Sequence, residues 1–207
     1  MERHRGNVGK IYYMMGKSSS GKDTLYKRLL DDKELNLKTV IPYTTRPIRE
    51  GEAEGREYFF CDAFKADELE RAGKVVERRD YQTIHGIWTY FTVDDGQIVL
   101  ENSNYLMIGT LESYQKVRNY YGKENLIPIY IEVEDGERLQ RALDRERMQN
   151  QPKYEEMCRR FLADTKDFSE ENLKKAEITR RFINGDLEET QAEITEFIHS
   201  KKKKQDI

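Results

Sequence analysis

Apolar, β-favouring segments alternate along this chain with stretches in which apolar residues recur at helical spacing. The extended apolar segments, which predict strands, lie at 11–15, 37–41, 105–108, 127–133 and 178–183. The stretches of helical period, which predict helices, lie at 25–30, 112–121, 135–143, 153–168 and 187–198. Strands that alternate with helices are typical of a mainly parallel sheet flanked by helices and joined by right-handed crossovers. The predicted fold class is therefore α/β.

One part of the chain interrupts this alternation. From residue 42 to about residue 55, proline, glycine, threonine, arginine and glutamate replace the regular pattern, and the aromatic stretch at 81–93 is rich in turn residues. A short helix is expected at 63–72 and a strand at 75–79. We therefore expect a small mixed subdomain, inserted after the second strand of the main sheet.

These patterns also predict how the chain is divided. Its 207 residues are enough for one α/β domain with an insertion, which we expect over residues 10–198, followed by a basic, solvated tail at 199–207. The expected parts of the domain are the core at 10–41, 93–144 and 158–198, the insertion at about 42–92 and a small lid at about 145–157.

Composition narrows the classes of function. Charged residues make up 36% of the chain, against about 25% in typical domains, yet the net charge is only −3, so nucleic acid is not an expected partner. No apolar run is long enough to span a bilayer, so no membrane association is expected. Cys61 and Cys158 match no metal-ligand spacing and predict reduced thiols. We therefore expect a cytoplasmic protein, either a monomer or a homodimer.

The most informative short motif directly follows the first predicted strand. It is a glycine-rich loop that leads into a helix and consists of Gly16, Lys17, Ser18, Ser19, Ser20, Gly21, Lys22, Asp23 and Thr24. Its two glycines let several backbone N–H groups turn inward, and these donors, the positive helix end and the Lys22 ammonium suit a polyphosphate. The alternative is an exposed Ser/Gly-rich connection, which the flanking strand and helix disfavour. The usual position of the Mg²⁺-binding Ser or Thr holds Asp23, and Thr24 follows it.

A second motif lies in the irregular segment. Residues 44–58 have the sequence Thr-Thr-Arg-Pro-Ile-Arg-Glu-Gly-Glu-Ala-Glu-Gly-Arg-Glu-Tyr. Arg46 and Arg49 lie three residues apart beside a proline, so both guanidinium groups can reach one phosphate, and the Tyr58 hydroxyl can donate to another phosphate oxygen. The alternative is a solvated charged loop.

The two motifs, at this separation, resemble those of the guanylate kinase family, which belongs to the P-loop nucleoside monophosphate kinases. The resemblance extends, with weaker anchors, from about residue 10 to residue 198. It implies a P-loop kinase core that binds ATP, an inserted GMP-binding subdomain and a small lid. It further implies phosphoryl transfer from ATP to GMP, with Mg²⁺ as cofactor and with ATP and GMP as small-molecule partners.

The resemblance also implies roles for individual residues. GMP would be bound by Arg46, Arg49, Tyr58, Glu77, Tyr90 and Thr92, and the Glu77 carboxylate would accept hydrogen bonds from guanine N1–H and the 2-amino group. ATP would be bound by the loop at 16–24 and by Asn184, with Thr24 or Asp23 near the Mg²⁺ ion. The groups that would act on the transferred phosphoryl group are Lys22, Arg46, Arg49, Arg160 and either Arg145 or Arg147.

Three departures from the family pattern leave the acceptor open. Pro42 replaces a serine that commonly contacts guanine, Asp23 replaces the usual loop residue, and Gly109 begins a stretch without the family's two aspartates. The first alternative is therefore a kinase of the same fold that acts on another phosphorylated acceptor, such as ribose 1,5-bisphosphate. The second is a non-catalytic guanylate-kinase-like binding module, although such modules usually lose the loop lysine that this chain keeps as Lys22.

Overall fold

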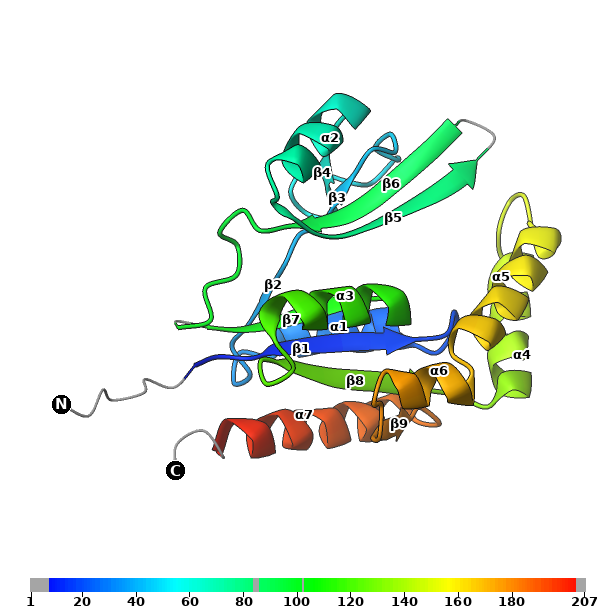
Figure 1. Ribbon diagram of the computed structural model, residues 1–207. Coiled ribbons are helices and arrows are strands. Elements are labelled where there is room, and N and C mark those ends of the chain that lie inside the picture. Colours follow the sequence, from blue (N-terminus) through cyan, green and yellow to red (C-terminus); the bar gives the residue numbers. More distant parts are fainter. Residues whose placement is uncertain (1–7, 84–85, 102, 204–207) are drawn as a thin grey trace.

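The computed structural model describes residues 8–83, 86–101 and 103–203 and contains two β-sheets (Figure 1). The larger sheet has five strands in the order β2-β7-β1-β8-β9, and each pairing in it is parallel. Its strands are β1 (Ile11–Gly16), β2 (Leu37–Thr39), β7 (Asn104–Gly109), β8 (Leu126–Glu132) and β9 (Arg181–Ile183). The predicted α/β class with a mainly parallel sheet is confirmed.

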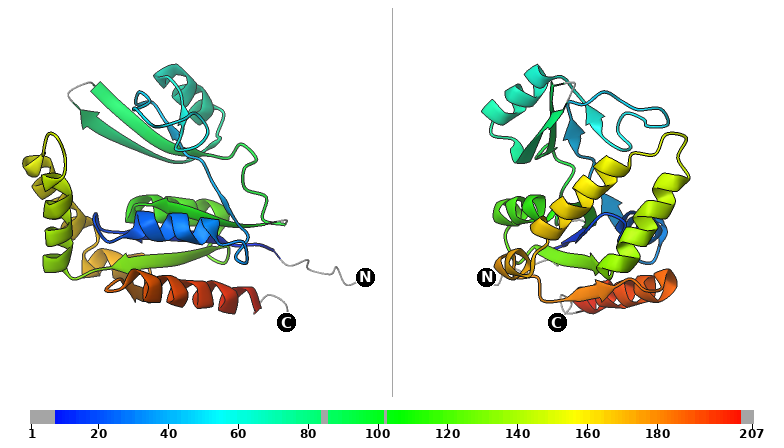
Figure 2. Two further views of the ribbon diagram at one scale, coloured as in Figure 1. Left: turned by 180° about the vertical axis from the view of Figure 1, so that it is seen from behind. Right: turned by 90° about the vertical axis from the view of Figure 1, so that its right-hand side faces the viewer.

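Helices cover both faces of this sheet. The helices α1 (Lys22–Asp31) and α7 (Leu187–Lys203) pack on one face, and α3 (Leu111–Tyr121) and α6 (Glu170–Lys175) pack on the other. The helices α4 (Asp135–Arg147) and α5 (Tyr154–Asp167) lie beyond the end of the strands (Figure 1). Successive side chains of a strand point to opposite faces, so Tyr12 and Met14 pack in the cluster of α1 and α7, whereas Tyr13 and Met15 pack in that of α3. Figure 2 shows α1 and α7 in front of the sheet when the molecule is viewed from behind.

The smaller sheet lies above the larger one in Figure 1 and has the strand order β4-β3-β6-β5. Its elements are β3 (Tyr43–Thr44), β4 (Phe59–Phe60), α2 (Ala63–Arg71), β5 (Val75–Thr83) and β6 (Gly86–Val93). The long strands β5 and β6 pair in antiparallel fashion, and α2 packs on them through Ala66. The Lys116 ammonium on α3 donates to the Arg78 carbonyl oxygen on β5 at 2.8 Å, which ties this sheet to the core.

Three segments differ from the expectation. Of the aromatic stretch at 81–93, residues 81–83 form the end of β5 and residues 86–93 form β6, because their aromatic and β-branched side chains pair across the two strands. Helix α4 continues to Arg147, beyond the helix predicted at 135–143 and into the segment expected to form the lid, and the buried Glu146 carboxylate accepts the Lys153 N–H at 3.0 Å. Helix α6 has no counterpart in the predicted elements, and the Ser169 side chain caps its first turn.

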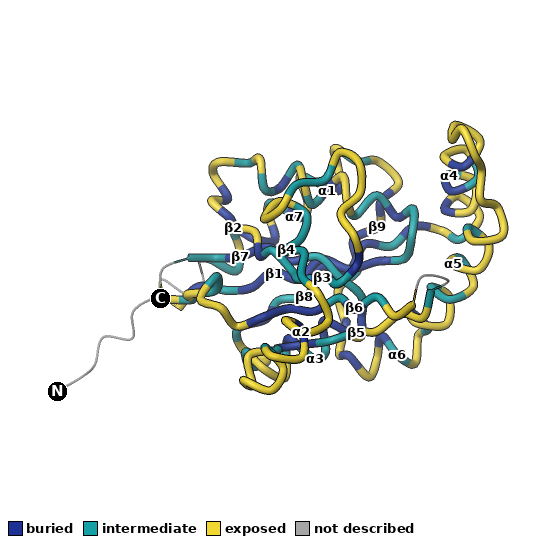
Figure 3. The backbone as a smooth tube through the Cα atoms, turned by 90° about the horizontal axis from the view of Figure 1, so that it is seen from above, coloured by how far each residue is buried: buried dark blue, intermediate teal, exposed yellow. Residues whose placement is uncertain are grey.

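Burial is concentrated in the central strands (Figure 3). All six residues of β1 are buried, whereas α5 has no buried residue along its length. Helix α5 is therefore held largely by contacts of its polar and partly buried side chains, a condition that suits an element able to move. Within the described ranges, no helix is both long and apolar enough to cross a bilayer.

Candidate active site

The phosphate loop connects β1 to α1, and two glycines shape its backbone. A Cβ at Gly16, the last residue of β1, would lie 2.5 Å from a carbonyl oxygen of β8. Gly21 has φ +83° and directly precedes α1, and the Asn184 side chain fills the space beside it while donating to the Ser20 carbonyl oxygen at 2.8 Å. The loop therefore sits at a helix N-terminus, where unpaired N–H groups and the helix dipole favour an anion.

Two hydroxyls of this loop have no protein partner. Ser19 Oγ and Ser20 Oγ are buried and make no hydrogen bond with any described residue. Ser19 also has φ +64°, which residues other than glycine adopt infrequently. Buried polar groups are nearly always hydrogen-bonded in folded proteins, and strained backbone gathers at functional sites. The loop therefore has the character of a site that a polar ligand completes.

The substitution Gly21→Ala is expected to destabilise this loop and to weaken the binding of ATP, the ligand that the resemblance implies. A Cβ at this position would lie 2.3 Å from Asn184 Nδ2, and the positive φ alone costs an L-residue about 1–2 kcal/mol. We expect the melting temperature to fall by about 2–8 °C in thermal unfolding, with a smaller stabilisation by added ATP than in the wild type. Gly185→Ala is the matched control, because a Cβ there meets no atom within 4 Å. Equal stability of the two variants would contradict the prediction.

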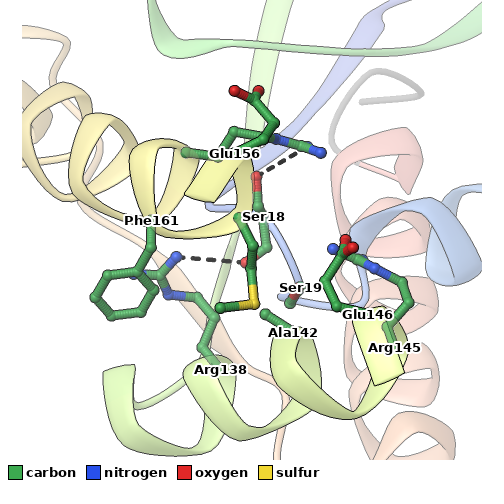
Figure 4. Close-up of a pocket in the computed structure, with 10 residues that line it drawn as sticks. Ser18, Ser19, Arg138, Ala142, Arg145, Glu146, Glu156 and Phe161 are labelled. Carbon is green, nitrogen blue, oxygen red and sulfur yellow. Dashed lines mark hydrogen bonds between the residues drawn. The ribbon is translucent and has the colours of Figure 1, made fainter. Parts of the chain in front are cut away.

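Helices α4 and α5 meet the phosphate loop at Ser18 (Figure 4). Asp164 Oδ2 accepts the Ser18 N–H at 2.6 Å, and Arg160 Nη2 lies 3.1 Å from Ser18 Oγ, to which it donates. Arg138 Nη1 lies 3.5 Å from the Ser18 carbonyl oxygen, and its guanidinium carbon is 3.9 Å from the centre of the Phe161 ring. The predicted Arg160 is thus next to the loop, together with the buried Arg138, which the sequence reasoning missed.

A small pocket lies between the loop and these two helices, and arginines dominate its charge. Its charged lining residues are Arg138, Arg145, Glu146, Glu156 and Arg160. Arg147 is not part of the lining; it is exposed and forms a 3.5 Å ion pair with Asp144. Of the two arginines that the sequence left open, Arg145 is therefore the one beside the phosphate loop.

The two lysines of the loop differ in how they are held. Lys17 Nζ forms a 3.0 Å ion pair with Asp135 at the start of α4. Although burial works in the opposite direction, Lys17 and Arg138 lower the pKa of the Asp135 carboxyl below its ordinary value. Lys22 Nζ lies 3.1 Å from the Asp23 carboxylate, whose side chain is 77% exposed. An exposed partner is weakly bound, so the Lys22 ammonium can exchange it for a phosphate.

On the smaller sheet, predicted acceptor residues lie together. Glu77 and Thr92 are direct cross-strand partners of β5 and β6, and Arg79 stands opposite Tyr90. All four share one face, because cross-strand partners and residues two apart point the same way. Thr92 Oγ1 donates to Glu77 Oε1 at 3.1 Å, and Arg79 donates to both carboxylate oxygens at 2.9 and 3.2 Å. The Glu77 side chain is 1% exposed, so this cluster is buried.

Arg46 is buried and held in place by protein groups. Its guanidinium donates to both oxygens of Glu52 at 2.6 and 2.8 Å and lies 5.1 Å from the centre of the Tyr58 ring. Tyr58 contacts Tyr90 edge-on, with 5.7 Å between ring centres, so the arginine adjoins the Glu77 face. The hydrogen bonds from Arg46 lower the pKa of Glu52 to about 2. The side chain of Arg49 is exposed, and its backbone N–H donates to Glu52 at 2.8 Å.

Hydroxyl groups fill the position where the family pattern has aspartates. A Cβ at Gly109 would lie 2.2 Å from the Tyr13 hydroxyl, so no larger side chain fits there. Tyr13 Oη and Ser113 Oγ are 2.6 Å apart, and Thr110 forms a capping box with Ser113 at the start of α3. Burial raises the pKa of Tyr13, and the nearby charge of Glu77 adds to this effect. A neutral hydroxyl pair therefore faces the smaller sheet from the core.

The remaining predicted residues lie around the first turn of α1. Asp23 and Thr24 are exposed at its start. Asn184 is buried, and its amide is bonded to the Ser20 carbonyl oxygen and, at 3.3 Å, to the Thr190 hydroxyl, so it supports the loop from behind. In the part of the chain that the structure describes, no group of three or more His, Cys, Asp or Glu side chains is placed to hold a metal ion.

Four polar residues of this site escaped the sequence reasoning. They are Glu52, Arg79, Arg138 and Asp164. Two of them had a local signal in the sequence. Alternation along a strand could have placed Arg79 on the same face as Glu77, and Glu52 lies within the second motif. No local pattern marks Arg138 or Asp164, because their partners in the loop are 120 and 146 residues away.

Comparison with known proteins places this geometry in a family. The model of the guanylate kinase family matches residues 8–201. The chain is 31% identical over 124 residues to guanylate kinase of Porphyromonas gingivalis, an alignment that covers 59% of this chain and 64% of that protein, just under two thirds of it. It is 28% identical to guanylate kinase of Mycoplasma mobile over 196 residues, which cover 92% of this chain and 94% of the relative.

A solved structure agrees with these sequence relatives. The crystal structure of guanylate kinase from Anaplasma phagocytophilum superimposes with a TM-score of 0.66 over 95% of this chain and 87% of that one, at 20% identity. At this identity the match establishes the fold alone. The family model, in contrast, spans nearly the whole chain, and the protein therefore belongs to the guanylate kinase family.

Proposed function

We propose that the protein transfers the γ-phosphoryl group of ATP to the phosphate of GMP and releases ADP and GDP. The observation that supports this most is the shared face of the smaller sheet. There Glu77, Tyr90 and Thr92 lie together, and Arg46 adjoins them through the Tyr58 ring. A buried carboxylate suits a base with N–H donors, and a nearby guanidinium suits the phosphate of the same nucleotide.

The donor side of the reaction belongs to the phosphate loop. The N–H groups at the start of α1 bind the β- and γ-phosphates of ATP, and Lys22 stabilises the charge that develops between them. Arg145 and Arg160 line the pocket beside this loop and add positive charge to the phosphoryl group during transfer. Phosphoryl transfer requires little covalent chemistry from the protein, so positioned charges supply most of the catalysis.

The acceptor side belongs to the smaller sheet. Glu77 and Thr92 orient the base, and Arg46, Tyr58 and Tyr90 hold the phosphate that attacks ATP. Glu52 orients Arg46, whose bidentate pair leaves N–H groups of the guanidinium for substrate. Arg49, exposed at the same loop, adds a second cation when the substrate phosphate arrives. The arrangement aligns acceptor and donor phosphates and reduces the access of competing water.

The oxygen groups of the first turn of α1 fit a magnesium ion. Mg²⁺ prefers oxygen ligands and usually keeps several waters beside substrate phosphates, so one or two protein oxygens suffice. The hydroxyl of Thr24 and the carboxylate of Asp23 are exposed beside Lys22 and are of this kind. When bound with ATP, Mg²⁺ neutralises charge on the phosphate oxygens.

Replacing Asp23 tests its place near the metal. The variant Asp23→Ser is expected to raise the Mg²⁺ concentration that gives half-maximal activity by about tenfold, because a carboxylate close to the ion is lost. Magnesium titrations at saturating ATP and acceptor measure this shift. Asp31→Ser, at the opposite end of α1, is the matched control and leaves the titration unchanged. A titration of Asp23→Ser that coincides with the wild type would exclude Asp23 from the metal environment.

The proposed activity is tested by coupled detection of ADP with a panel of acceptors. The panel contains GMP, dGMP, AMP, UMP and ribose 1,5-bisphosphate. We expect turnover with GMP to exceed turnover with AMP and UMP, since adenine has no N1–H to donate to a carboxylate and uracil is a smaller ring than a purine. Absence of turnover with every acceptor, despite GMP binding, would favour a non-catalytic binding module.

One observation favours a second candidate, a kinase for another phosphorylated acceptor such as ribose 1,5-bisphosphate. Glu77 is already bonded to Arg79, and hydroxyls replace the aspartates near Gly109, so the acceptor side is less anionic than the family pattern implies. Preferential turnover of ribose 1,5-bisphosphate in the same panel would establish this candidate and reject GMP as the substrate.

A further inference from the structure

The carboxylate that is expected to recognise guanine is largely occupied by the protein itself. Arg79 Nε donates to Glu77 Oε2 at 2.9 Å, and Arg79 Nη2 donates to Oε1 at 3.2 Å. Thr92 Oγ1 donates to the same Oε1 at 3.1 Å. Among the described residues, these three hydrogen bonds reach the Glu77 carboxylate.

A count of lone pairs shows what this leaves for a substrate. An ionised carboxylate accepts about four hydrogen bonds, two at each oxygen. Oε1 of Glu77 receives two donors, from Arg79 and Thr92, and is filled. Oε2 receives one donor and keeps one lone pair. A guanine that presents N1–H and the 2-amino group needs one free lone pair on each oxygen, and this carboxylate has only one in total.

The pair between Arg79 and Glu77 is also costly to open. The exposed fractions of the two side chains are 16% and 1%, so separation would leave a buried carboxylate short of partners. Burial works against the charge of Arg79, but the Glu77 carboxylate raises the pKa of the guanidinium above its ordinary value. The nearest acidic neighbour on the strand, Asp80, is itself bonded to Thr89 and Arg78. Arg79 therefore has no better partner to which it could turn.

We infer that Arg79 determines the base selectivity of the acceptor site by limiting Glu77 to one hydrogen bond with the substrate. The site then recognises the N1–H of a 6-oxopurine nucleoside monophosphate and takes little account of the 2-amino group. Inosine monophosphate, which has the same N1–H and lacks the amino group, is accordingly accepted at a rate close to that of GMP. This inference rests on the proposed function, since it concerns the acceptor of the same phosphoryl transfer.

The test compares kcat/KM for GMP and inosine monophosphate in the wild type and in Arg79→Met. Methionine keeps much of the volume of arginine and frees one lone pair on each oxygen of Glu77. We expect the wild type to prefer GMP by less than about tenfold and the variant to increase this preference by about tenfold or more, because a second hydrogen bond to guanine becomes available. Arg79→Lys, which restores a cation, is expected to return the ratio toward the wild-type value.

Arg78→Met is the matched control, because Arg78 lies next to Arg79 on β5 but pairs with Asp67, Glu70 and Asp80. The ratio of kcat/KM for GMP to kcat/KM for inosine monophosphate in this variant is expected to equal that of the wild type. Calorimetric Kd values for both nucleotides, measured without ATP, give the same comparison independently of turnover.

Two outcomes would overturn the inference while leaving the proposed function intact. One is a wild type that prefers GMP by more than about tenfold, and the other is an unchanged ratio in Arg79→Met with GMP still phosphorylated. The wild-type ratio decides the question even where Arg79→Met does not fold. A wild type that neither binds nor phosphorylates GMP would instead reject the proposed function.

Discussion

Turnover is expected to fall by a factor on the order of 10² or more when Lys22 is replaced by alanine, because in the proposed reaction its ammonium stabilises charge that develops during phosphoryl transfer. Lys22 is the first residue of α1, and its side chain is 18% exposed, so its ammonium lies at the phosphate loop with restricted access to water. A positioned cation in such a site acts without reorganisation at the moment of reaction. Steady-state kinetics with saturating ATP and GMP measure the loss.

The helix α1 provides the control for this experiment. Lys27→Ala removes another ammonium from α1, one that is exposed and away from the loop, and is expected to leave kcat unchanged. Thermal unfolding of Lys22→Ala should match that of the wild type, since the partner of Lys22 is the exposed Asp23. Wild-type turnover in the Lys22 variant would remove the phosphate loop from the mechanism.

Replacement of Arg46 by methionine is expected to raise KM for GMP by about a hundredfold and to lower the free energy of unfolding by about 3 kcal/mol. The first effect follows from the loss of the guanidinium that we propose binds the substrate phosphate. The second follows because Glu52, with 17% of its side chain exposed, loses its bidentate partner and remains charged in a poorly solvated site. Kinetics and chemical denaturation measure the two effects separately.

The stability effect of the Arg46 variant has a defined pH dependence. In the wild type the pKa of Glu52 is lowered from 4.5 to about 2 by its hydrogen bonds with Arg46. A carboxyl with a lowered folded-state pKa contributes stability that is fully present above its unfolded value and is lost as the pH falls. The difference in unfolding free energy between wild type and variant should therefore be constant above about pH 5 and shrink toward pH 2.

Two further variants distinguish substrate binding from folding at this site. Arg49→Met is expected to raise KM for GMP with little loss of stability, because Arg49 is exposed. Replacing Glu52 by glutamine in the Arg46→Met background removes the unpaired charge and should recover part of the stability, while KM stays high. Recovery of KM in this double variant would mean that Arg46 does not contact the substrate phosphate.

Much of the fold could be predicted from local pattern. The apolar segment at 11–15 forms β1, and the residues that follow it form the phosphate loop and α1, because each depends on neighbours in the sequence. Helix α6 and strand β6 were not predicted. The former is six residues long and is defined by its cap, and the latter is stabilised by pairing with β5. Short or cross-strand elements of this kind carry weak local signals.

The candidate site likewise contains residues that local sequence revealed and residues that only the fold brings together. The loop at 16–24 and the motif at 44–58 that contains Arg46 each lie within one short segment, so composition and spacing revealed them. The partners of Ser18 and of Tyr13 could not be found in this way. Asp164 is 146 residues from Ser18, and Ser113 is 100 residues from Tyr13. Only folding brings such groups within hydrogen-bond distance.

The sequence alone therefore determined the α/β class, the phosphate loop with Lys22 and the family to which the chain belongs, since these depend on contiguous residues and their spacing. The tertiary structure decided three further matters. It placed Arg145 rather than Arg147 beside the loop, it filled the space at Gly109 with the Tyr13 hydroxyl, and it paired Arg79 with Glu77. The physical reason is that selectivity at a buried site depends on which lone pairs and volumes remain free. The side chains that meet across strands and helices determine which lone pairs and volumes remain free.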